Sequence, residues 1–153
     1  MIRASRRIEA LEQCHSEVLA LCDGLEAVAD SLPHNVQKRI CLTLAATLEP
    51  LIARTQALEE QALFPLLETM QNPQMARTMA RLREEHLADH SAASEVSEAL
   101  QDLGKDRSKL SPDAMGYLLR SFFVSMRRHV QSERDLIAMA LPAEPGRGPA
   151  MDG

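Results

Sequence analysis

The chain is poor in aromatic residues, since its 153 residues include three Phe, one Tyr and no Trp. So few rings exclude a surface that binds nucleic-acid bases by stacking, and they disfavour a β-sandwich core. A basic excess is also lacking, because 17 Lys and Arg stand against 22 Asp and Glu and give a net charge of −5. We therefore expect no interface for nucleic acid or for an anionic membrane.

Long apolar segments and disulfide patterns are lacking as well. No run approaches the roughly eighteen apolar residues of a membrane span, and the N-terminal MIRASRR precedes no apolar segment of the kind found in a signal peptide. The cysteines Cys14, Cys22 and Cys41 are odd in number and have no CxxC spacing, which favours free thiols over disulfides or a zinc site. We expect a cytoplasmic protein.

What the sequence does contain is helix-forming residues in a helical pattern. Ala, Leu, Glu, Arg, Met and Gln dominate, and three breaks with Pro, Gly, Asn or Ser lie at residues 31–35, 71–73 and 104–112. Between the breaks apolar residues recur every three or four positions. The pattern predicts an all-α fold, an up-down-up-down four-helix bundle over residues 1–141. The Pro- and Gly-rich residues 142–153 are expected to form a flexible C-terminal tail.

Prolines also give local expectations. Pro50 lies inside the second helical segment and is expected to kink or divide it, and Pro65 has the same effect near its end. Ser111 followed by Pro112 is a favourable helix start, because Ser caps the helix and Pro suits the first helical position.

Polar side chains interrupt the apolar stripes. A single core histidine is most often a hydrogen-bonded structural residue, whereas a carboxylate at a core position must be paired or bind a metal. The interrupting residues come from all four segments and are candidate metal ligands: His15, Glu59, His86, His90, His129 and Glu133.

Counting from the turns places these residues at one level. Glu59 lies 13 residues before Asn72 and His86 lies 14 after it, so at about 1.5 Å per residue both are roughly 20 Å from that turn. The same count around the third break brings His90 and His129 to one level, while the histidine of the first segment fits less closely. Four imidazoles and two carboxylates in one layer indicate a metal site, with room for two ions.

Two other kinds of site fit poorly. A ferritin-type site needs two ExxH motifs, and Glu12–His15 is the only such pair. Cys14 is next to His15, but neighbouring helical residues point about 100° apart, which does not suit a nucleophile and its base. We therefore expect no catalytic residues of this type.

Around the candidate ligands the chain resembles the hemerythrin-like, or HHE cation-binding, domains over roughly residues 8–140. The matching pieces are His15, EEQALFP at 59–65, HLADH at 86–90 and HVQSE at 129–133. The resemblance implies a helical bundle with two irons bridged by two carboxylates. By position, the roles it implies are: His86, His90 and His129 on the first iron, Glu59 and Glu133 as bridges, and His15 on the second iron.

One position departs from the family. Thr55 stands where the family has a histidine of the second iron, one turn before Glu59. That iron would then have His15, the two bridges and either water or the Thr55 hydroxyl. Such a site should bind its metal less tightly, because imidazole suits iron better than a hydroxyl or water does. Either two irons bind and the second is labile, or the protein holds one ion.

The resemblance implies a non-haem iron protein that binds or senses O₂, NO, peroxide or redox state. An open coordination position in an apolar pocket is the chemical requirement for such a role. The alternative is a helical interaction or regulatory module whose metal site is mononuclear, structural or vacant. An oxidase-like enzyme lacks any substrate-pocket signal, so we expect no enzymatic activity. The sequence identifies no protein partner.

Overall fold

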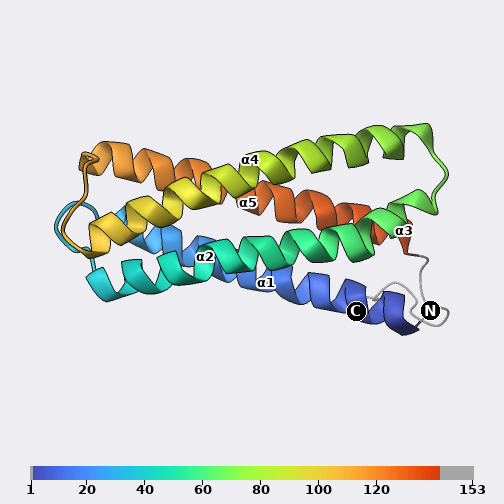
Figure 1. The fold of residues 1–153 in the computed structure, drawn as a ribbon, viewed down its shortest axis with the longest axis horizontal. Helices are drawn as coiled ribbons and strands as arrows, with labels where there is room; N and C mark the ends of the chain where they lie inside the picture. Colours follow the sequence, from blue (N-terminus) through green and yellow to red (C-terminus); the bar gives the residue numbers. More distant parts are fainter. Residues whose placement is uncertain (1, 142–153) are drawn as a thin grey trace, which may run out of the picture.

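A computed structural model describes residues 2–141 of the chain. These residues form an all-helical bundle with no strand among them (Figure 1). The helical elements are α1 (Ile2–Ser31), α2 (Lys38–Leu58), the π-helical turn η1 (Glu59–Leu63), α3 (Phe64–Glu68), α4 (Pro73–Gly104) and α5 (Pro112–Ala140). Because η1 and α3 continue directly from α2, the chain makes four helical rods, and the prediction of an all-α fold is confirmed. The expected tail at 142–153 lies outside the described residues.

The connections fall at the three predicted breaks. Figure 1 shows the connections at 32–37 and 105–111 at one end of the bundle and the turn at 69–72 at the other. As expected, Ser111 caps α5, because its hydroxyl oxygen accepts a hydrogen bond from the N–H of Ala114 at 3.1 Å. Short connections of this kind keep consecutive helices next to each other.

The second rod differs from its prediction. Helix α2 runs through Pro50 and is not divided there, and the irregular part of the rod is the π-helical turn just before Pro65. Proline has no N–H to bond the carbonyl four residues before it, and its ring crowds that carbonyl. A wider turn immediately before Pro65 relieves this crowding.

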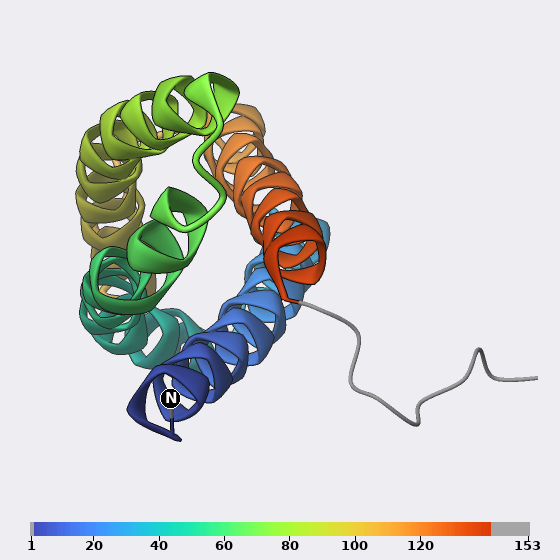
Figure 2. The same cartoon turned by 90° about the vertical axis from the view of Figure 1, so that its right-hand side faces the viewer.

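Packing between the rods brings every helix to a common interior. Helix α1 packs on α2 and α5, and α2 packs on α4. Figure 2 shows α3 turned inward at one end of the bundle, where it contacts both α4 and α5. The rod that carries η1 and α3 therefore bends towards the centre of the bundle at this end.

The apolar core is divided into two clusters, one towards each end. One contains the fully buried Leu25, Leu48 and Leu119, and the other is built around Leu11 and Phe64. Along every rod the residues between the two clusters include buried polar side chains: His15, Thr55, Glu59, His86 and Glu133. A polar layer therefore crosses the middle of the bundle between two apolar regions.

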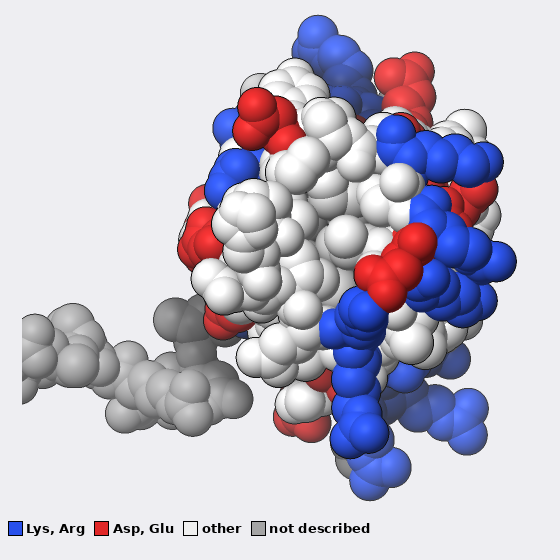
Figure 3. Space-filling view, turned by 90° about the vertical axis from the view of Figure 1, so that its left-hand side faces the viewer, with Lys and Arg blue, Asp and Glu red and all other residues white. Residues whose placement is uncertain are grey.

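The end of the bundle with two connections carries exposed basic side chains. Lys105, Arg107 and Lys109 in the connection at 105–111 are all exposed, and Lys and Arg side chains gather along one side of this end (Figure 3). Within residues 2–141, no helix combines the length and the apolar character needed to cross a membrane. Inside the bundle, the buried polar side chains of the centre lie in the layer described above.

The core should lose much of its stability when a central leucine is shortened. Leu48 is fully buried, whereas Leu87 is 75% exposed on α4. We expect Leu48→Ala to lower the free energy of unfolding by about 2–5 kcal/mol and Leu87→Ala to change it by no more than about 0.5 kcal/mol. Urea denaturation of the two variants measures this, and equal losses would contradict the packing described above.

Candidate metal centre

The π-helical turn places the first carboxylate of the site. In η1 the N–H of Phe64 donates to the carbonyl of Glu59, five residues earlier, so the turn is wider than an α-helical one. The side chain of Glu59 is only 1% exposed and lies inside the bundle. Residues that follow the turn are rotated relative to an unbroken α-helix, which is why Phe64 can also face inward.

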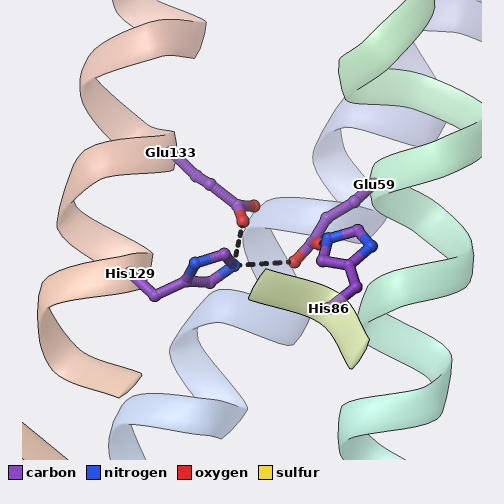
Figure 4. A group of neighbouring side chains, drawn as sticks. All are labelled: Glu59, His86, His129 and Glu133. Carbon is purple, nitrogen blue, oxygen red and sulfur yellow. Dashed lines mark hydrogen bonds and ion pairs between the residues drawn. The ribbon is translucent and has the colours of Figure 1, made fainter. Parts of the chain in front are cut away.

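Four side chains from three helical elements converge at the centre. Each of Glu59, His86, His129 and Glu133 offers a nitrogen or oxygen atom, and these atoms all lie within 4.8 Å of one another (Figure 4). Nε2 of His129 lies 3.4 Å from Oε1 of Glu59 and also pairs with Glu133, one turn later on α5. Nε2 of His86 pairs with Oε2 of Glu59. The two carboxylates thus face the two imidazoles.

Helix α1 joins this group through His15. Its Nε2 lies 3.0 Å from Oε1 of Glu133, and both side chains are completely buried. All four rods of the bundle therefore contribute to one connected polar group. Five of the six candidate ligands named above are in it.

His90 is the candidate that the structure does not bring to the group. Its side chain is exposed on α4, whereas Asp89 beside it is half-buried. Four residues advance an α-helix by about 400°, so His90 is rotated about 40° away from His86 in one direction. Asp89 is rotated about 60° in the other direction, and in this bundle that is the side that faces the interior.

Thr55 is buried one turn before Glu59, as the family resemblance implied, but its hydroxyl is bonded within its own helix. The hydroxyl donates to the carbonyl of Leu51 at 2.7 Å. Thr55, Glu59, Asp89 and His129 line a small cavity together with several apolar side chains. The space open to the centre of a water-sized sphere is about 10 Å³, enough for roughly one water molecule.

One buried nitrogen of the group has no partner. Within residues 2–141, Nδ1 of His15 makes no hydrogen bond, whereas Oε2 of Glu59, Nε2 of His86 and Oε2 of Glu133 take part only in the close ion pairs described above. Buried polar atoms are nearly always hydrogen-bonded in folded proteins, so an unpartnered imidazole nitrogen beside such crowded ion pairs needs an explanation. Imidazole nitrogens and carboxylate oxygens are ligands that transition metals use. The donor set therefore fits a metal ion.

The charges in the group are strongly coupled. Burial alone would lower the pKa of His129, but hydrogen bonds to Glu133 and Glu59 raise it to about 11. Burial alone would raise the pKa of Glu133, but its bonds to His129 and His15 lower it to about 2. Without a metal, the group is thus a network of buried ion pairs, and a bound cation takes the place of protons.

Side chains around the group orient the two imidazoles. Oε2 of Glu85 lies 3.3 Å from Nδ1 of His129, and the ring of Phe64 stacks on that of His86 with centroids 5.7 Å apart. Gln56 donates from its side-chain amide to the carbonyl of His86 at 2.9 Å. A carboxylate on the outer nitrogen of a histidine fixes its tautomer and ring direction, which is typical of metal-ligating histidines.

Three of these surrounding residues were missed in the sequence: Phe64, Glu85 and Asp89. Phe64 and Asp89 lie inside the motif segments, but their inward direction depends on the π-helical turn and on the rotation of α4. Glu85 immediately precedes a candidate ligand and, on the helix, points towards α5 and His129. The residue count from the turns, which placed the candidate ligands at one level, would have found Glu85 if it had included the acidic residues beside each histidine.

Comparison with known proteins agrees with the site. The hemerythrin HHE cation binding domain matches residues 6–141, which is nearly all of the described chain. No curated protein and no solved structure matches the chain. The chain belongs to the hemerythrin HHE cation-binding domain family.

Proposed function

We propose that this chain is a non-haem iron protein that binds or senses a small ligand, O₂, NO or peroxide, or responds to redox state. The observation that carries the proposal is the buried group of Glu59, His86, His129 and Glu133, whose ligand atoms lie within 4.8 Å of one another. The small cavity beside Glu59 and His129 supports a small ligand. Bound iron would supply a centre that changes oxidation state and accepts an additional ligand.

The residues fit two metal positions, a first with four ligands close together and a second with fewer ligands of its own. Glu59, His86, His129 and Glu133 would hold the first ion. His15 reaches the same group through Glu133 and would serve the second ion, with the two carboxylates between them. The proposal includes the up-down-up-down helix order of the family, which the short connections support.

The rest of the chain would protect this centre. Apolar clusters on both sides of the polar layer exclude water from it, and Glu85 keeps His129 directed inward. The cavity of about 10 Å³ is far too small for an organic substrate. This supports binding or sensing over an oxidase-like reaction.

A second candidate is a protein with a single ion in a structural or regulatory role. Two observations favour one ion over two: the Thr55 hydroxyl is bonded to its own helix, and His90 is exposed. In each case, a side chain that could have been a ligand of a second ion, or a further ligand of the first, is not available to the metal. Iron content per chain decides between one and two ions.

The compact group should depend on His129 much more than on His90. We expect His129→Ala to lose most of the bound iron, because it removes the imidazole that contacts both carboxylates. His90→Ala should retain nearly all of it, since that side chain is exposed. Iron per chain after purification from iron-supplemented cells measures both. If His90→Ala lost as much iron as His129→Ala, the ligand set proposed here would be wrong.

Metal binding should stabilise the fold. The folded chain holds the donor atoms together and the unfolded chain does not, so free metal at about 100 times its Kd adds about 2.7 kcal/mol. For a domain of this size that raises Tm by roughly 5–10 °C. Calorimetry of the iron-loaded and chelator-treated protein measures the difference, with His129→Ala as the control that should show little. Equal Tm values for the two wild-type samples would place the metal outside the core.

Thr55→His tests the second position. The new imidazole would lie one turn before Glu59 on the same helix face and would enter the cavity that Thr55 now lines. We expect iron content to rise towards two per chain, measured beside the wild-type protein. Thr55→Val is the matched control, because it removes the hydroxyl without adding a ligand. No gain of iron in Thr55→His, combined with a lower Tm from overpacking, would contradict the assignment of this position.

A further inference from the structure

A surface pocket between α4 and α5 lies next to the cavity of the metal centre. The pocket has a volume of about 420 Å³, and its walls include Ala88 and Asp89 of α4 and Ser125 and His129 of α5. Asp89 and His129 also line the inner cavity. These two side chains therefore form the partition between the surface pocket and the space beside the candidate ligands.

Asp89 is the more movable half of this partition. His129 is held by Glu59, Glu85 and Glu133. Asp89 makes no hydrogen bond or ion pair with any other residue in the part of the chain that the structure describes. A change in its side-chain rotamer breaks no such interaction.

The charges along the pocket change from its rim to its floor. Arg81 and Arg128 are exposed at the rim, and the half-buried Glu85 and Asp89 lie nearer to His129. Arg81 pairs with Glu85 at 3.6 Å, whereas no ion pair holds the Asp89 carboxylate beside the cavity. An anion moving inward would therefore meet a negative charge in a site of low water content, where charges interact strongly.

We propose that the pocket between α4 and α5 is the route by which small molecules reach the metal centre, and that Asp89 selects uncharged molecules over anions. The inference rests on the proposed function and adds the path and the class of ligand. O₂, NO and hydrogen peroxide are all uncharged and pass, whereas anions such as azide are held back by the carboxylate.

Blocking the pocket tests the route. Ala88→Trp places a large ring in the pocket from α4, and Ser125→Trp does so from α5; both positions are exposed and neither is a candidate ligand. Ala20→Trp is the matched control, because it fills the groove of about 460 Å³ between α1 and α2, whose walls share no residue with the inner cavity. The full iron-loaded chain is used, with azide added to the oxidised protein and NO to the reduced protein in stopped-flow measurements.

We expect Ala88→Trp and Ser125→Trp to slow binding of both probes about tenfold or more, equivalent to a barrier increase of about 1.4 kcal/mol. Ala20→Trp should leave both rates unchanged. Unchanged rates in the two pocket variants, or equal slowing in Ala20→Trp, would overturn the route. Loss of iron from both pocket variants would overturn it too, because the pocket wall would then be part of the metal site itself.

Asp89→Asn tests whether the carboxylate selects uncharged molecules over anions, since the substitution removes the negative charge and keeps the size of the side chain. At pH 8 we expect the affinity for azide to rise about tenfold, as expected for removing a like charge several ångströms away, with little change for NO. An unchanged azide affinity would overturn the selective role of Asp89. Absence of iron from the wild-type chain would instead overturn the proposed function, and the inference with it.

Discussion

The burial of two carboxylates in the middle of a helical bundle is the constraint on which the rest of this structure depends. Glu59 and Glu133 are 1% and 0% exposed, and an isolated buried carboxylate is too costly to persist in its charged form. Imidazoles from α1, α4 and α5 pair with them and supply the compensating charge. Each helix is therefore fixed in rotation and in height by the need to deliver at least one polar side chain to this layer.

The two apolar clusters make such a layer tolerable. They bury large side chains at both ends of the bundle, and this apolar burial is the main favourable contribution to folding. The layer itself fixes how the helices are aligned along the bundle, but it costs stability. Buried ion pairs seldom stabilise a fold more than apolar packing of the same volume does. A bound cation would reverse this balance, since it would replace shared protons with coordination to the same imidazoles and carboxylates.

Much of this arrangement follows from the sequence, and the remainder depends on small rotations. The helix breaks and the common level of the polar residues are set by chain length and by periods of three and four, which the sequence displays directly. The heptad pattern cannot tell whether Asp89 or His90 faces inward, because the two lie on either side of the stripe through His86. Nor does it predict that Pro65 acts by widening the preceding turn while Pro50 leaves its helix undivided.

The two departures at the site act in the same direction on its chemistry. Thr55 offers a hydroxyl that is bonded to Leu51, and His90 is turned to the surface, so each removes a nitrogen donor. What remains around the centre is three imidazoles and two carboxylates, and several divalent transition metals accept such a set. The preference for iron that we propose would then depend on metal supply and on the ligand that the site binds. With fewer nitrogen donors, the shape and charge of the space around a bound metal would carry more of the selectivity.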